Sequence, residues 1–221
     1  MSAGDQIINS NISKPLTRLA RFNAGFNDVV KRLFDILTSS VVLLFSSPFF
    51  LLIAIAIKRD SPGPVFYRGI RTGKNGKPFH ILKFRTMDDS LTSYEGPRIT
   101  AHDDQRVTSI GRWLRDTKLN EFPQFWNVLK GEMSLVGPRP ERPYFVDMLA
   151  EQIPYYRRRL KVRPGITGWA QVKHKYDESI EDVKVKLRYD LFYIENMSFR
   201  MDIKILARTI LVVLFGKGHY N

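Results

Sequence analysis

The sequence predicts a mixed α/β protein that is mainly helical, with a re-entrant membrane hairpin, amphipathic interfacial helices and a small β element. Three observations support this fold class: one long apolar stretch, several later segments with apolar residues at helical spacing, and two short β-rich runs around a turn. The 221 residues can bury a sizeable core. We expect a leader over residues 1–30, a membrane hairpin over 31–59 and a cytoplasmic, membrane-associated domain over 60–221.

The composition restricts the kinds of partner. The formal net charge is +13 and the pI is about 10.0, which favours nucleic acid, anionic lipid or a phosphorylated small molecule. The basic residues are dispersed and form no helix-turn-helix, RNP or zinc-finger pattern, so we expect no nucleic-acid partner. The absence of cysteine excludes disulfides and thiolate zinc sites. Membrane lipids and phosphorylated substrates are the better candidates.

Residues 1–30 show no secretory signal peptide, because they lack a continuous apolar core followed by a small-residue cleavage site. Leu16, Leu19 and Phe22 could form a short apolar face there. We expect a polar leader, either flexible or partly amphipathic.

The only long apolar stretch, Leu33 to Ile57, is about 25 residues long and could cross a bilayer as one helix. Three features argue against simple crossing. Ser47 and Pro48 lie near its middle, where proline removes a backbone hydrogen bond. Its first half is unusually polar, and the pairs Lys31-Arg32 and Lys58-Arg59 place equal positive charge at both ends. A segment with such symmetric charge has no preference for opposite sides of a membrane.

A helix–break–helix hairpin that enters one leaflet accounts for all three features. Each arm of about 12 residues would extend roughly 18 Å, which reaches about the bilayer centre. The backbone carbonyls freed by Pro48 need donors at that depth, and the neighbouring serine hydroxyls can supply them. A kinked spanning helix and a buried soluble helix remain as alternatives.

The segments after the anchor predict a β hairpin and several helices. Val65 to Arg68 and Lys77 to Phe84 are expected as short strands around a glycine-containing turn, and Ser90 to Ala101 as a surface loop. Helical patterns begin near Gln105 and then cover Glu178–Asn196 and Met201–Phe215. The last of these is amphipathic and could lie on a membrane surface or pack into the core.

Glu121 to Lys130 also has apolar residues at helical spacing and predicts a helix. Pro123 lies close enough to its start to be tolerated. Asn120 would then be the N-cap or its neighbour, beside backbone N–H groups that favour anions. This stretch is therefore the first candidate for a phosphate-handling site.

Seven runs of residues, in their order along the chain, resemble the bacterial sugar transferase family, the monotopic polyprenol-phosphate phosphoglycosyl transferases. The runs are Lys31–Asp35, Ser61–Tyr67, Lys83–Met87, Gly111–Arg115, Lys118–Gly131, Ser134–Glu141 and Arg163–Trp169. No single run would suffice, but the linked set covers roughly residues 28–215.

The resemblance implies an activity and a location. Members of this family transfer a sugar 1-phosphate from a UDP-sugar to undecaprenyl phosphate and release UMP, with Mg²⁺ as cofactor. This is the first membrane step in the assembly of bacterial polysaccharides and glycoconjugates. The resemblance also implies a monotopic protein on the cytoplasmic face of the bacterial inner membrane, with a re-entrant hairpin broken at a Ser-Pro, here Ser47-Pro48. The chain would be a short, catalytic-core member.

The family resemblance assigns catalysis and metal binding to an Asp-Glu pair, which here reads Asn120-Glu121. The aspartate is the family's covalent nucleophile, and an amide oxygen is a poor one. Three explanations are open: a deliberate Asp→Asn substitution, a natural variant in which Glu121 or the lipid phosphate attacks, or a catalytically inactive binder. The arginine that contacts phosphate in the family corresponds to Arg115.

Arg139 lies between Pro138 and Pro140, a rigid frame that suits a bidentate contact to phosphate or to the nucleotide. Further candidates for the polar site are Lys83, Arg85, Arg142 and Asp190, with surface ion pairing as the alternative for the three cations and a buried structural role for the aspartate. The four histidines lack ligand spacing, so no histidine metal site is expected.

Two functional interpretations follow. The first is a membrane-bound phosphoglycosyl transferase, and the second is a non-catalytic membrane scaffold that binds a UDP-sugar or lipid phosphate. The motifs do not indicate which sugar or pathway is served. The oligomeric state is also open, a homo-oligomer included.

Overall fold

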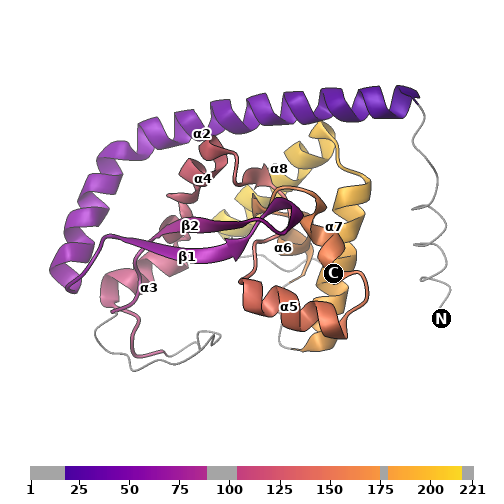
Figure 1. Ribbon diagram of the computed structural model, residues 1–221. Helices are drawn as coiled ribbons and strands as arrows, with labels where there is room; N and C mark the ends of the chain where they lie inside the picture. Colours follow the sequence, from indigo (N-terminus) through magenta and orange to yellow (C-terminus); the bar gives the residue numbers. More distant parts are fainter. Residues whose placement is uncertain (1–17, 89–103, 175–178, 216–221) are drawn as a thin grey trace.

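The computed structural model describes residues 18–88, 104–174 and 179–215. The expected loop over Ser90–Ala101 and the first seventeen residues of the expected leader lie outside the described residues. The described chain is mainly helical, as predicted. It has two small two-stranded sheets, of which the sequence predicted one. One long helix lies along the top and one side of the remaining elements (Figure 1).

This long helix, α2, runs from Arg18 to Asp60 and includes the last thirteen positions of the expected leader. Its helical assignment continues through Pro48, where we expected a break, and the ribbon bends so that its last turns run in a new direction (Figure 1). Ser47 Oγ donates to the Leu44 carbonyl over 2.8 Å. That carbonyl lies four residues before Pro48 and would otherwise lose its donor, so the expected role of serine is confirmed.

The apolar surface of α2 is largely uncovered. From Asp28 to Asp60 the helix is long and apolar enough to cross a membrane, with a mean hydropathy of 2.5 in its most apolar window. Large side chains along this part are exposed, among them Leu37 at 65%, Leu44 at 70% and Phe45 at 72%. Monomeric soluble proteins rarely expose a contiguous apolar patch of this kind, and such patches mark surfaces that contact protein or membrane.

The first part of α2 is fastened to the rest of the protein by polar contacts. Lys31 Nζ pairs with Asp202 Oδ2 at 2.5 Å and donates to the Val136 carbonyl over 3.1 Å. Asp35, with only 2% of its surface exposed, accepts a hydrogen bond from the Leu135 N–H over 3.1 Å. The polar residues in the first half of this segment therefore bind the strand that leads into the candidate site.

The last part of α2 contacts the same domain. Ile57 packs with Phe84 and Leu114 in a buried cluster, and the Ile110 N–H donates to Asp60 Oδ2 over 3.0 Å. Two parts of the bent helix, one from Lys31 to Asp35 and one from Ile57 to Asp60, are thus held by one folded body.

The predicted β hairpin is confirmed, with a first strand that is longer than the sequence suggested. β1 (Phe66–Thr72) pairs antiparallel with β2 (Pro78–Phe84), and Phe66 lies opposite Phe84. The short 3₁₀ turn η1 (Lys74–Gly76) joins them.

The predicted helix over Glu121–Lys130 begins later than expected. After α3 (Ser109–Asp116), the chain forms the 3₁₀ turn η3 (Leu119–Glu121), and α4 covers only Gln124–Lys130. Asn120 is therefore not a helix N-cap: it lies inside η3, while Pro123 occupies the N-cap of α4. Lys118, in a left-handed conformation with φ 60°, separates α3 from η3 and prevents one continuous helix.

The remaining elements surround a short parallel pair of strands. β3 (Ser134–Val136) pairs with β4 (Gly165–Thr167). The other elements are α5 (Pro143–Gln152), η4 (Tyr156–Lys161), α6 (Trp169–Lys173), α7 (Ile180–Glu195) and α8 (Phe199–Phe215). The main core includes Val128, Met133, Val136, Tyr193 and Ile205.

Candidate active site

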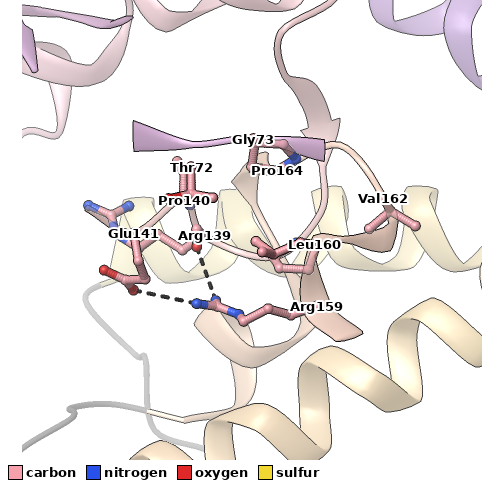
Figure 2. Close-up of a pocket in the computed structure, with 10 residues that line it drawn as sticks. Thr72, Gly73, Arg139, Pro140, Glu141, Arg159, Leu160, Val162 and Pro164 are labelled. Carbon is pink, nitrogen blue, oxygen red and sulfur yellow. Dashed lines mark hydrogen bonds and ion pairs between the residues drawn. The ribbon is translucent and has the colours of Figure 1, made fainter. Parts of the chain in front are cut away.

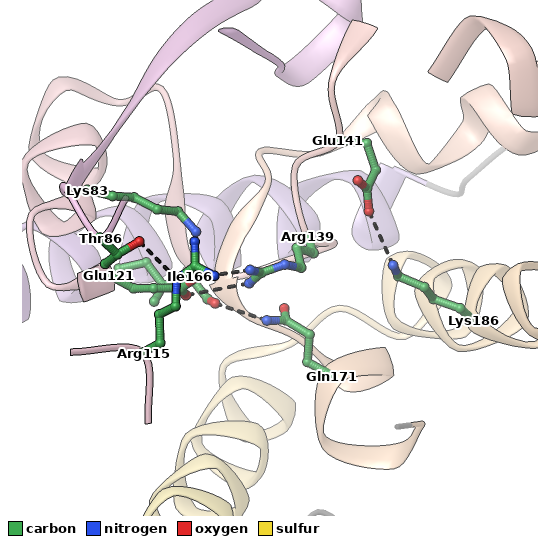
Figure 3. Close-up of polar contacts among 9 residues, drawn as sticks. All are labelled: Lys83, Thr86, Arg115, Glu121, Arg139, Glu141, Ile166, Gln171 and Lys186. Carbon is green, nitrogen blue, oxygen red and sulfur yellow. Dashed lines mark hydrogen bonds and ion pairs between the residues drawn. The ribbon is translucent and has the colours of Figure 1, made fainter. Parts of the chain in front are cut away.

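Glu121 lies at the centre of a cluster of charged side chains (Figure 3). Lys83 Nζ donates to Glu121 Oε1 over 2.6 Å, and Arg139 Nη2 donates to the same oxygen over 2.9 Å. Arg139 Nη1 reaches Glu121 Oε2 at the longer distance of 3.5 Å. The three residues come from β2, η3 and the loop after β3, so the fold brings together three of the positions predicted from the sequence. Two cations face one carboxylate.

The cluster sets the charges of its members. Burial alone would raise the pKa of Glu121, but the charges of Arg139 and Lys83 outweigh burial and hold this pKa far below its usual range. Burial lowers the pKa of Lys83 to about 8, although the charge of Glu121 opposes the shift. At neutral pH the carboxylate is therefore ionised and most of the lysine is still protonated. The site carries excess positive charge in a partly exposed position, which suits an anionic ligand.

Asn120 is next to Glu121 in the chain, and Arg115 lies on the preceding helix, α3. Asn120 precedes Glu121 within η3 and is half-buried. Arg115, in the last turn of α3, donates from Nε to Thr86 Oγ1 over 2.9 Å, and α3 packs against η3. The structure thus places Asn120, Glu121 and Arg115 on adjoining elements.

The loop that carries Arg139 is rigid at its base. Gly137 has no space for a side chain, because a Cβ there would clash with the Arg163 carbonyl. The Gly165 N–H donates to the Pro138 carbonyl over 2.9 Å. This loop lines a small pocket with the end of β1 and with η4 (Figure 2). Pro138 and Pro140 are buried, whereas 39% of the Arg139 side chain is exposed.

The remaining predicted residues have different surroundings. Arg85 is 3% exposed and donates to the carbonyls of Ser61, at 2.7 Å, and Pro62, so it braces the turn after α2. Arg142 is half-buried at the N-cap of α5. Asp190 is 2% exposed. It is paired in the protein interior, which fits the structural alternative considered for it.

With the geometry described, the relatives of the chain can be compared with it. A sequence model of the family described as bacterial sugar transferase matches residues 26–216. The chain belongs to this family. The resemblance seen in the sequence motifs is therefore confirmed.

Three relatives illustrate the family. A UDP-N-acetylgalactosamine-undecaprenyl-phosphate N-acetylgalactosaminephosphotransferase from Aeromonas hydrophila is 43% identical over 86% of this chain and 44% of its own length. A UDP-glucose:undecaprenyl-phosphate glucose-1-phosphate transferase from Klebsiella pneumoniae is 41% identical over 89% and 42%. A protein of the same name from Caulobacter vibrioides is 39% identical over 97% and 79%. The chain thus spans less than half the length of the first two relatives.

Sequence reasoning missed Arg159, which contacts the loop of the candidate site. Its Nη2 atom pairs with Asp190 Oδ2 at 2.8 Å and also donates to the Arg139 carbonyl over 3.0 Å. Glu141 was also missed: it accepts from Lys186 over 3.2 Å and lies 4.0 Å from Arg159. The concentrated run Tyr155–Arg159 was the available signal, but a basic and aromatic run is equally typical of a solvated surface.

A magnesium ion fits this site only if the substrate supplies most of its ligands. Among the described residues, no group of three or more His, Asp or Glu side chains could hold a metal by itself. Mg²⁺ commonly uses one or two carboxylates together with phosphate oxygens and waters. Glu121 supplies one such carboxylate and is adjacent to Asn120 in η3.

Proposed function

We propose that this protein transfers a sugar 1-phosphate from a UDP-sugar to undecaprenyl phosphate and releases UMP. The observation that carries the proposal is the ionised Glu121 held between Lys83 and Arg139. A carboxylate at this position can attack phosphorus, and two flanking cations can neutralise a diphosphate. The names of the relatives from Aeromonas hydrophila and Klebsiella pneumoniae support the same substrate classes.

Glu121 is the nucleophile that we propose for this chain, because the Asn120 amide is uncharged. Among the described residues, Glu121 Oε2 accepts only the 3.5 Å contact from Arg139. Oε2 forms a bond to the phosphorus attached to the sugar, the bond from that phosphorus to the UMP oxygen breaks, and UMP leaves with the electron pair. An oxygen of undecaprenyl phosphate then attacks the same phosphorus and displaces the Glu121 carboxylate. No proton transfer is needed, since both attacking oxygens are ionised.

We also propose Mg²⁺ as the cofactor, with the Asn120 amide oxygen as a neutral ligand and Glu121 as a charged one, directly or through a bound water. When bound, the ion would neutralise part of the charge of the diphosphate. UMP release should stop in the presence of EDTA and recover when Mg²⁺ is added in excess. Full activity in EDTA would contradict this assignment.

The membrane arrangement that we propose is monotopic, with α2 bent inside the cytoplasmic leaflet of the bacterial inner membrane. The support is that Lys31, near the start of the apolar part of α2, and Ile57, near its end, contact the same folded body, while large apolar side chains between them are exposed. A spanning helix would pull these two contacts to opposite sides. Exposed Ile203, Ile210 and Leu211 on α8 suggest that this helix also lies at the interface.

The absence of cysteine makes this topology directly testable. Val29→Cys and Arg59→Cys, both at exposed positions, should be labelled from the cytoplasmic side by a reagent that cannot cross the membrane. Labelling of the two positions from opposite sides would establish a spanning helix instead.

A panel of UDP-sugars tests the function and also the role of Asn120. The chain is incubated with undecaprenyl phosphate and Mg²⁺ beside its Asn120→Asp counterpart, and UMP is measured. UMP release and a phosphosugar adduct on the Glu121 peptide would support the proposed nucleophile. Release without an adduct would favour direct attack by the lipid phosphate. A large gain in Asn120→Asp would identify the substitution at 120 as inactivating, and UDP-sugar binding without release from either form would support the scaffold alternative.

A further inference from the structure

The loop that presents Arg139 is held in place mainly through its carbonyl oxygens. The Pro138 carbonyl accepts from the Gly165 N–H over 2.9 Å, and the Glu141 carbonyl accepts from the Thr72 N–H over 2.8 Å. Both of these donors belong to the backbone. The Arg139 carbonyl between them accepts from a side chain, the Arg159 guanidinium, over 3.0 Å (Figure 2). The conformation at Arg139 therefore depends on how that guanidinium is oriented.

Three contacts orient the Arg159 guanidinium within the protein interior. Its Nε and Nη2 atoms contact Asp190 Oδ2 at 3.0 and 2.8 Å, and its Nη1 atom donates to the Tyr156 hydroxyl over 2.9 Å. The side chains of Arg159 and Asp190 are 3% and 2% exposed. A planar fork with several fixed donors can hold a carboxylate and a carbonyl together, whereas a lysine ammonium is a single point charge.

We propose that Arg159 and Asp190 are positioning residues that act through Arg139. They fix the backbone from which the Arg139 guanidinium reaches Glu121, and thereby its alignment for the phosphate groups of the donor. The assignment of those phosphates rests on the proposed function. The positioning itself concerns only the conformation of the loop.

A buried ion pair is not in itself an indication of stabilisation. The desolvation cost of two buried charges often matches their attraction, so an apolar replacement of similar volume can be equally stable. What an apolar pair could not supply is the hydrogen bond to the Arg139 carbonyl. The 3₁₀ turn η4, which carries Arg159, also contains a matched control. Arg157 pairs with Asp147 at 2.7 Å, and the side chains of this pair are 61% and 62% exposed.

Hydrogen–deuterium exchange on the full chain in detergent tests the positioning without any turnover. In Arg159→Lys, which keeps a positive charge beside Asp190, the amides of Thr72 and Gly165 should exchange at least about fivefold faster, since the loop that accepts from them is loosened. Arg157→Lys should leave both rates unchanged. Unchanged rates in Arg159→Lys, or equal acceleration in both variants, would overturn the proposal. If Arg159→Lys fails to fold, Asp190→Asn is measured in the same way.

A double-mutant cycle then tests whether the effect on the reaction passes through Arg139. Arg159→Lys alone should lower kcat/KM for the UDP-sugar about tenfold. In an Arg139→Ala background the same change should cost less than about twofold, because the residue it positions is gone. Equal losses in both backgrounds would show that Arg159 acts on stability in general and would overturn the proposal. Failure of both the unmodified chain and its Asn120→Asp counterpart to release UMP would refute the proposed function, while the exchange rates would still decide the positioning.

Discussion

Two carboxylates near Arg139 have opposite environments. Glu121 contacts Lys83 and the Arg139 guanidinium, and 18% of its side chain is exposed. Asp190 contacts Arg159, and only 2% of its side chain is exposed. Each carboxylate is paired with at least one cation, so pairing alone does not distinguish them. The difference lies in what can replace the partner.

The first cluster is more exposed to solvent than the second, as the exposed fractions of the Glu121 and Asp190 side chains show. Arg139, with 39% of its side chain exposed, can exchange the Glu121 carboxylate for a substrate phosphate while it remains partly solvated. Separating Arg159 from Asp190 would leave a buried charge without compensation. The first cluster is therefore suited to chemistry and the second to holding a conformation, and this comparison generates the predictions that follow.

The largest effect should come from Glu121→Gln, an isosteric change that removes the charge. UMP release should fall at least about a thousandfold because the proposed nucleophile is lost. UDP binding, measured by calorimetry, should be unchanged or tighter, since Lys83 and Arg139 no longer have a competing carboxylate. Glu181→Gln, at a side chain that is 76% exposed, is the control. Loss of UDP binding together with activity would indicate that Glu121 maintains the fold instead.

The second largest effect should come from Asp190→Asn, and it should be an effect on stability. The change leaves Arg159 buried without a full counter-charge, which typically costs about 3–5 kcal/mol. For a chain of this size we expect a fall in Tm of roughly 10 °C, measured by thermal unfolding in detergent. Asp147→Asn, in the exposed pair with Arg157, should change Tm by less than about 2 °C. Similar shifts in Tm for both variants would contradict the conclusion that the buried pair differs from the exposed one.

The two clusters also differ in how far they could be predicted from the sequence. Glu121, Lys83 and Arg139 were found because the family motifs contain them. Arg159 was not found, because no periodicity reports that its side chain reaches the carbonyl of a residue twenty positions earlier. Arg85 was predicted to line the polar site because its motif is visible in the sequence. Its burial beneath the turn at Ser61 has no sequence signal.

Local structure was predicted where local chemistry decides it. The turn between β1 and β2 follows from its glycines and asparagine, and the exposed apolar face of α2 follows from composition. The start of α4 was placed too early because apolar spacing continues from Phe122 onwards. The left-handed Lys118 interrupts the backbone before that point, and a lysine in that conformation has no sequence signature.

A smaller effect is expected on the pH dependence of activity, which should distinguish the contribution of Lys83 from that of the arginines. Its pKa is lowered to about 8 by burial, so Lys83 is protonated at pH 6–7 and becomes neutral as the pH rises through 8. The value of kcat/KM for the UDP-sugar should then decrease about tenfold between pH 7 and 9, because that profile reports ionisation of the free enzyme. In Lys83→Arg the decrease should move above pH 10, since a guanidinium stays charged. A decrease at the same pH in both proteins would exclude Lys83 as its source.

The smallest effect should come from Lys186→Met, because Glu141 is intermediate between the two clusters. Its side chain is 26% exposed and accepts from Lys186 over 3.2 Å, while Arg159 lies 4.0 Å away and still compensates its charge. Partial solvation reduces the cost of losing Lys186, so Tm should fall by about 2–4 °C, corresponding to about 1 kcal/mol. The UDP affinity should weaken less than about threefold. If Lys186→Met lowers Tm as much as Asp190→Asn, then the exposure of a carboxylate does not determine how much its ion pair contributes to stability. The distinction between an exchangeable pair and a fixed one would then have to rest on the identity of the cation.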